Sequence, residues 1–415
     1  LMPQLMAGIA YVALGLDCIR RREWPIPKGP AMTSAAFLAF VWLLEVANPE
    51  QFNAKVVLLG LISYVYFIPL MFLGYAFIRN ARDARRLGVF LALISILVTV
   101  VGMTQFVLGP ARVEALVPGF RSFGQGTSNG LAAFRFPSTF AAVAQLQDFL
   151  TLGSVILLGA CWDLAGWRRV LTVTGFAGLF FIGLINVSRT YYVTFPAGLI
   201  ILLVLLWQSR AKRAGVRATA PRTPLSRRLL RLVLLVSFGA VAVLGAVHFA
   251  GNILAPRLAT LSPDSPGFST DIVSRFTKSA ETLAGLVQTD YGWWHGHGTG
   301  TSTPYLFHLD MEAPIVEAFV PEVVYQTGVL GLLAYLFLYG STFATCRWAI
   351  AKVRDRSVSV WACVFAAYLL LVVVESALGD EVLVLFPSAM FFWVILGSLM
   401  GLADGDRTGA MAPAP

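Results

Sequence analysis

Charged residues are scarce in this sequence: only 13% of its 415 residues are Asp, Glu, Lys or Arg. A typical soluble domain carries roughly twice that share, because its surface must face water. Hydrophobic residues make up 57% of the chain instead, and the mean hydropathy is +0.75. The composition therefore excludes an ordinary soluble fold and predicts an integral membrane protein.

Cysteine and histidine are also rare, with four residues of each type. The cysteines lie in or at the ends of apolar stretches, so we interpret them as small core residues. His295 and His297 share one glycine-rich run, but no set of carboxylates or thiols lies beside them to complete a zinc site. The sequence therefore predicts no metal and no other cofactor.

Apolar stretches recur along the chain, and each is long enough to cross a hydrocarbon core about 30 Å thick. Helices satisfy their own backbone hydrogen bonds in lipid, so we predict an all-α, polytopic membrane protein. Roughly eleven spans are visible, and their predicted bounds are Pro3–Ile19, Ala31–Ala47, Ala54–Ile78, Leu87–Leu108, Phe136–Ala160, Val170–Val187, Tyr191–Trp207, Leu229–Ala250, Val324–Cys346, Val358–Ala377 and Val382–Leu402.

The net charge of +9 does not indicate nucleic-acid binding, because the basic residues gather in every second loop. Such loops stay on the cytoplasmic side of a membrane. This orientation predicts helices one to eight over residues 1–250, a periplasmic loop with short helices over 251–323, helices nine to eleven over 324–402, and a cytoplasmic tail over 403–415. It places the first residue outside, so we expect one further span upstream, making twelve.

Several arginines lie on the predicted outer side, against this charge rule: Arg121, Arg135, Arg189 and Arg275. An arginine at membrane depth is costly and usually has an anionic partner, and its guanidinium suits phosphate. We therefore predict that these residues bind a polyanion such as a diphosphate, with Tyr191 beside them. The alternative for Arg189 is an interfacial residue that reaches towards water.

The run Gly292–Gly300 is the most glycine-rich part of the predicted loop. Glycines let a backbone approach a ligand and offer N–H groups to anions, so His297, Gly298 and Gly300 are candidate binding residues. No Lys-Ser or Lys-Thr pair follows, which excludes a Walker loop. The two tryptophans of the run suit a membrane interface or the face of a sugar.

Carboxylates near the ends of spans are the candidate bases. Glu317 and Glu322 precede the ninth span, where a carboxylate can act as a general base, contact substrate, or simply stabilise the helix start. His308 is the rival base, since histidine has the better intrinsic pKa. Asp148 and Glu375 lie inside spans, where such carboxylates pair with a buried arginine or line a polar cavity. The alternative for Glu375, and for Glu45, is that they reach water, because both lie near the outer ends of spans.

The order of these motifs resembles the bacterial O-antigen ligase and O-antigen polymerase superfamily. The matching pieces cover about the last half of the chain: Asn186–Thr190, Arg275 to Leu283, Gly296–Gly300, and Glu317 through the run Gln326-Thr327-Gly328-Val329-Leu330-Gly331. The resemblance implies a C-type glycosyltransferase fold and metal-independent, inverting transfer of glycans from undecaprenyl diphosphate at the outer leaflet. It also implies that Arg189 and Arg275 bind the diphosphate.

Ligases of this family usually place a histidine where this chain has Glu317. The difference favours a polymerase of a surface or secreted polysaccharide over a ligase that moves finished glycan to a lipid A core, with Glu317 as the base. A flippase or transporter of the same lipid-linked glycan is the alternative of another class. The expected partners are the lipid-linked glycan, the bilayer, a chain-length regulator and a flippase. The expected location is the bacterial inner membrane, with the active site facing the periplasm.

Overall fold

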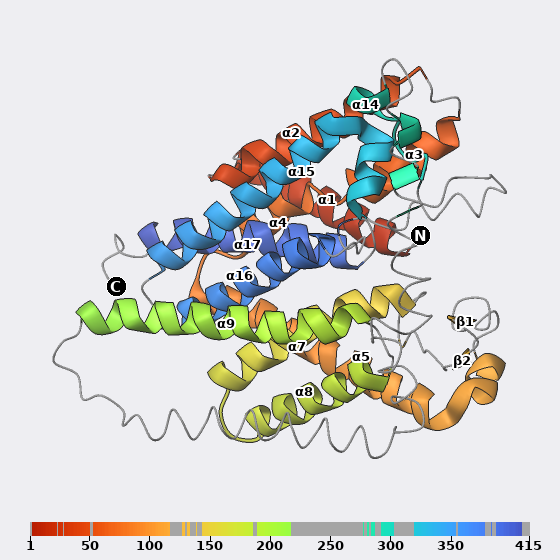
Figure 1. Ribbon diagram of the computed structural model, residues 1–415. Helices are drawn as coiled ribbons and strands as arrows, with labels where there is room; N and C mark the ends of the chain where they lie inside the picture. The colour runs from red at the N-terminus through yellow and green to blue at the C-terminus, as the bar shows by residue number, and fades with distance from the viewer. Residues whose placement is uncertain are drawn as a thin grey trace. The chain divides into compact units, whose positions relative to one another are not determined.

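The computed structural model describes residues 2–22, 24–27, 29–49, 53–116, 143–185, 189–216, 292–302, 319–353, 356–377 and 387–408, with a few short pieces between them. Helices dominate this part of the chain (Figure 1). Its one sheet pairs the two-residue strands β1 (Thr127–Ser128) and β2 (Leu131–Ala132) in antiparallel fashion. The predicted all-α class is confirmed.

Most described helices overlap a predicted span, with ends that differ by up to nine residues. Their bounds are α1 (Met2–Arg21), α2 (Pro30–Leu44), the 3-10 helix η1 (Glu45–Ala47), α3 (Ala54–Tyr64), α4 (Leu70–Phe77), α5 (Ala81–Leu116), α7 (Val143–Asp163), α8 (Trp167–Ile185), α9 (Arg189–Val216), α14 (Gly292–His295), α15 (Phe319–Lys352), α16 (Arg356–Ala377) and α17 (Ser388–Thr408). The predicted span Leu229–Ala250 lies outside the described residues.

Long apolar helices identify the chain as a helical membrane protein. Within the described residues, six helical segments have the length and hydropathy to cross a bilayer: Pro30–Ala47, Arg82–Gly109, Trp167–Leu184, Phe319–Lys352, Val358–Ser376 and Ser388–Gly405. Two shorter apolar helices, Ala54–Tyr64 and Val193–Ser209, accompany them. The total of eleven spans and the periplasmic loop stay predictions.

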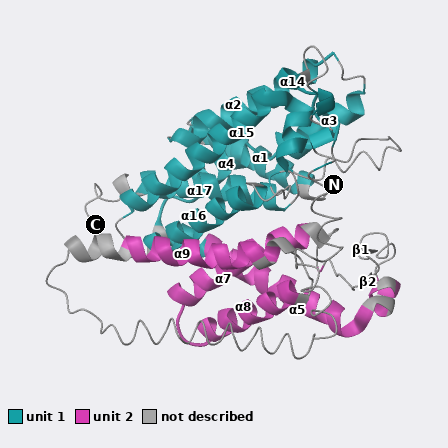
Figure 2. Cartoon of the chain, viewed as in Figure 1, with its two compact units in different colours: residues 1–86, 271–415 teal, residues 87–270 magenta. Residues whose placement is uncertain are grey.

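The chain forms two compact units (Figure 2). The first joins residues 1–86 to residues 271–415, and the second comprises residues 87–270. The first unit therefore brings the amino-terminal helices together with the last ones. The predicted division into spans, loop and tail concerns the sides of the membrane and stays a prediction.

Glycines let two helices of the first unit approach closely. In this unit α17 packs against α4, and α15 packs against α2. A Cβ on Gly397 would overlap the backbone of Met71, and a Cβ on Gly74 would overlap the backbone of Val394. Small residues at such crossings allow tight van der Waals packing between helices in a membrane. This seam fixes α4 against α17.

Two predicted spans of the first unit are interrupted rather than continuous. The predicted span Ala54–Ile78 consists of α3 and α4 with a turn at residues 65–69 between them. Pro69, which lacks an N–H, stands at the start of α4. The predicted span Val324–Cys346 contains a break at Gly328, with φ 61° and ψ −160°. Apolar length alone did not reveal these breaks, because it does not report backbone geometry.

The second unit packs α7 against α8 and α9. Tyr191 of α9 is fully buried there. Its ring lies where a Cβ on Gly183 would be, and its hydroxyl is 3.4 Å from Oγ of Ser154. Thr151 and Thr194 add a second contact of 3.4 Å between α7 and α9. Small and hydroxyl-bearing residues thus join these helices, as in other membrane helix pairs.

Candidate functional site

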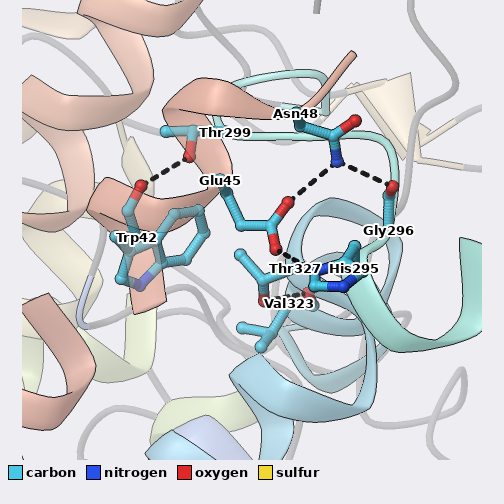
Figure 3. Close-up of polar contacts among 8 residues, drawn as sticks. All are labelled: Trp42, Glu45, Asn48, His295, Gly296, Thr299, Val323 and Thr327. Atoms are coloured by element: carbon cyan, nitrogen blue, oxygen red, sulfur yellow. Dashed lines mark hydrogen bonds and ion pairs between the residues drawn. The ribbon is translucent and has the colours of Figure 1, made fainter. Parts of the chain in front are cut away.

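A buried carboxylate faces a half-exposed imidazole in the first unit (Figure 3). Oε1 of Glu45 lies 3.2 Å from Nδ1 of His295, and Oε2 accepts a hydrogen bond of 2.8 Å from Nδ2 of Asn48. The Glu45 side chain is 1% exposed, whereas that of His295 is 50% exposed. The two residues are 250 positions apart in the sequence. A carboxylate so deeply buried requires hydrogen-bonding partners of this kind.

Local backbone geometry brings the two halves of this cluster together. Glu45 and Asn48 come from the short turn that follows α2, and His295 is the last residue of α14. Asn48 also donates a hydrogen bond of 3.1 Å to the carbonyl of Gly296. Gly296 has φ 66°, a conformation that favours glycine, so the chain turns sharply directly after His295.

The glycine-rich segment and the break in α15 pack directly against each other. A Cβ on Gly296 would lie 2.5 Å from the carbonyl carbon of Gln326. A Cβ on Gly328 would lie 2.6 Å from the amide nitrogen of His295 and would overlap the Trp294 carbonyl. Only glycine at both positions permits this backbone contact. The motif at Gly296–Gly300 and the motif at Gln326–Gly331 therefore form one packed substructure.

Backbone amides of the glycine-rich run donate to α15. His297 N donates to the Tyr325 carbonyl at 2.8 Å, and Gly298 N donates to the Gln326 carbonyl at 2.9 Å. Gly300 N donates to Oε1 of the Gln326 side chain at 2.7 Å. These bonds satisfy carbonyl groups next to the helix break. The three amides thus have protein acceptors, and the predicted ligand-binding role of His297, Gly298 and Gly300 stays a prediction.

A second buried network lies beside this substructure. The Tyr64 hydroxyl donates to Oε1 of Glu322 at 2.6 Å and accepts from Nε2 of Gln326 at 2.6 Å. The same Gln326 nitrogen lies 2.8 Å from Oγ of Ser302. The Tyr64 ring stacks on Trp42, with centroids 3.7 Å apart and planes 9° from parallel. This network joins α3 to α15 at the two interrupted spans.

Two exposed tryptophans precede His295. Trp293 is 41% exposed and Trp294 is 46% exposed, and their ring centroids are 4.3 Å apart. The flat apolar face of an indole suits either the face of a sugar or the interfacial region of a bilayer. The half-exposed imidazole therefore has aromatic surface directly beside it along the chain.

The predicted site residues fall in several places. Glu322 belongs to the buried network, and it is fully buried there. Arg189 is the first residue of α9 in the second unit, and Tyr191 lies in the core of that unit. The other predicted residues lie outside the described part of the chain: Arg121, Arg135, Arg275, Glu317 and the rival base His308. The convergence of the four arginines stays a prediction.

One interpretation of Glu45 and Glu375 was wrong. Their position near the outer ends of spans predicted contact with water, but they are 1% and 2% exposed. The other interpretation of Glu375, as a carboxylate with a buried arginine or a polar cavity beside it, stays a prediction. Glu45 is buried because η1 turns it towards the glycine-rich segment, where Asn48 and His295 contact it. Its presence in an otherwise apolar span was the available signal, since intramembrane carboxylates usually serve a function. Its partner could not be found from the sequence, because the two are so far apart in the chain.

Metal binding has no support in the described residues, where no group of three or more His, Cys, Asp or Glu side chains lies together. No protein-family model matches the chain, and no curated protein matches it. The fold and the long apolar helices define the class as a helical membrane protein.

Proposed function

We propose that the chain is a glycosyltransferase of the bacterial inner membrane that polymerises oligosaccharide repeat units carried on undecaprenyl diphosphate. The product is a surface or secreted polysaccharide made at the periplasmic face. The proposed chemistry is inverting and metal-independent. A chain-length regulator and a flippase are the proposed partners in the cell.

The observation that carries this proposal is the contact between two motifs on which the resemblance to O-antigen polymerases and ligases depends. Gly300 and Gln326 are 26 positions apart in the sequence, yet the glycine amide donates to the glutamine side chain. The amides of His297 and Gly298 donate to the same stretch of α15. Because the two motifs form one packed substructure, we infer that they act together in one functional site. The exposed tryptophans and His295 lie on this unit and provide polar and aromatic surface for a glycan.

The remaining roles follow from the resemblance and from side-chain chemistry. Arg189 and Arg275 would bind the diphosphate of the donor, because guanidinium groups form paired, charge-assisted hydrogen bonds with phosphate oxygens. The resemblance gives Glu317 the role of the base that activates the acceptor hydroxyl. Arg121 and Arg135 would extend the anion-binding surface.

Product size tests the proposal. The purified chain would be reconstituted in liposomes with lipid-linked repeat units extracted from a deletion strain of the source organism. A polymerase gives a ladder spaced by one repeat unit, releases undecaprenyl diphosphate, and keeps its activity in EDTA. A single transfer to added lipid A core supports a ligase instead. Absence of both products, with the lipid-linked donor intact, contradicts glycosyl transfer.

Transport of the lipid-linked glycan is the second candidate, and the interrupted spans favour it. The turn between α3 and α4 and the break at Gly328 meet at the buried Tyr64–Glu322–Gln326 network. Discontinuous helices around polar groups occur at the substrate sites of secondary transporters. Sidedness separates the two functions in a deletion strain. Lipid-linked repeat units accessible to impermeant periodate in spheroplasts support a polymerase, whereas inaccessible units support a transporter.

A further inference from the structure

Glu45 and His295 form a carboxylate–imidazole pair with the geometry of an oriented general base. Both oxygens of Glu45 have donors, Nδ1 of His295 at 3.2 Å and Nδ2 of Asn48 at 2.8 Å. When Glu45 is ionised it only accepts hydrogen bonds, and Nδ1 then carries the proton in this contact. The other ring nitrogen, Nε2, is then the unprotonated one in the neutral ring, with a lone pair available to accept a proton.

The surroundings of the pair leave that lone pair accessible. The His295 side chain is half exposed, and Nε2 has no hydrogen bond to any residue in the described part of the chain. Glu45, by contrast, is buried, so its contact with the imidazole lies in a low-dielectric setting. A residue that only held the loop in place would need no such exposed nitrogen. Glu45 thus holds the Nδ1 side of the ring, and the Nε2 side is accessible.

The backbone around His295 is in close contact with two other segments. Gly328 lies against its amide nitrogen, and Asn48 holds the next carbonyl, that of Gly296. A positioned base must hold its geometry to within a fraction of an ångström, so contacts of this kind favour catalysis over a mobile surface histidine. Trp294, immediately before His295, offers an exposed ring on which a sugar can stack.

We propose that His295 is the general base of the transfer reaction and that Glu45 is its positioning residue; this inference rests on the proposed glycosyltransferase function. Nε2 takes the proton of the acceptor hydroxyl while the oxygen attacks the anomeric carbon of the donor. The new glycosidic C–O bond forms as the bond from that carbon to the diphosphate oxygen breaks. The electron pair leaves with undecaprenyl diphosphate, and the imidazolium then loses its proton to water.

This assignment differs from the one that the resemblance implies. The resemblance gives the base role to Glu317, which lies outside the described residues. The described geometry points instead to a histidine that sits next to the aromatic surface and is held by a buried carboxylate. The two assignments predict different variants as inactive.

The test uses the purified full-length chain in liposomes with the extracted lipid-linked donor. His295→Asn keeps an N–H donor near the position of Nδ1 and so keeps the contact with Glu45, but it has no group that can accept the proton. We expect kcat to fall about 10²- to 10⁴-fold, as for other lost general bases. The kcat of His295→Ala should fall as far, and added imidazole should restore at least part of it. Glu45→Gln should lower kcat by about tenfold or more while KM changes little.

Control variants separate the loss of a base from a general loss of structure. Glu281→Gln, which alters an exposed carboxylate of the predicted loop, should keep wild-type turnover. A His295→Asn variant with turnover near that of the wild type overturns the base assignment while the proposed function stands. The base assignment is also overturned if His295→Ala elutes as a folded protein but its turnover does not rise when imidazole is added. If the wild-type chain transfers no glycan, both the function and the base assignment are overturned.

Discussion

The backbone of Gly328 lies against the backbone of His295, so that a Cβ on the glycine would be 2.6 Å from the histidine amide nitrogen. Gly328 also has a positive φ of 61°, which L side chains rarely adopt. One residue therefore breaks α15 and also gives His295 its place beside Glu45. The helix break and the candidate site depend on the same glycine.

Gly328→Ala is expected to disturb both the fold and the activity. The added methyl group overlaps the Trp294–His295 backbone, and the residue must hold a left-handed conformation. Together these effects should lower the free energy of unfolding by about 2 kcal/mol or more. Thermal unfolding in detergent measures the change. Gly340→Ala in the same helix meets no atom within 4 Å and should leave stability equal or higher. Equal unfolding temperatures for the two variants would contradict the packing argument.

Tyr64→Phe is expected to destabilise the first unit without disturbing its ring stacking. The variant keeps the ring against Trp42 but removes the hydroxyl that bonds Glu322 and Gln326. Removing one partner from a buried polar group lowers the free energy of unfolding by about 1–3 kcal/mol. A double-mutant cycle with Glu322→Gln in thermal unfolding should show strong coupling between the two positions. Simple additivity of the two losses would mean that the network contributes little.

Arg189→Ala and Arg275→Ala are expected to weaken donor binding if these residues bind the diphosphate. Loss of a charge-assisted contact of about 1.5–3 kcal/mol corresponds to roughly a 10- to 100-fold rise in KM for the lipid-linked donor. Arg189→Lys should recover only part of the loss, since an ammonium cannot form the paired contact. Arg168→Ala at the start of α8, in a predicted cytoplasmic loop, serves as the control. Cells that carry either alanine variant and still make full-length polymer would refute the diphosphate role.

Much of the fold could be predicted from the sequence, because lipid imposes a simple rule. Every backbone polar group in a hydrocarbon core needs an internal partner, so long apolar stretches become helices. The predicted span Val358–Ala377 matches α16 closely, and the predicted end of Leu87–Leu108 coincides with the break in α5 at Gly109. The breaks at residues 65–69 and at Gly328 were missed, because the length of an apolar stretch does not report backbone geometry.

The candidate site was predictable only in part. The glycine-rich run was singled out because glycine permits unusual backbone contacts, and the structure places that run against α15. The expected contact was with a ligand, whereas the described contacts are with Tyr325 and Gln326. Glu45 was expected to reach water because it lies near the outer end of its span, yet it is buried and accepts a hydrogen bond from Asn48, three residues further on. Its donors include His295, which is far from it along the chain.

By itself the sequence determined that this chain is a helical membrane protein, because hydropathy and backbone hydrogen bonding act locally and leave no other option. Only the tertiary structure decided which polar residues meet. Glu45 contacts His295, which is 250 positions away in the sequence. The glycine-rich segment packs into the break of α15 because of the backbone angles at single glycines. Long-range contacts of that kind arise from the packing of whole helices, which no local pattern encodes.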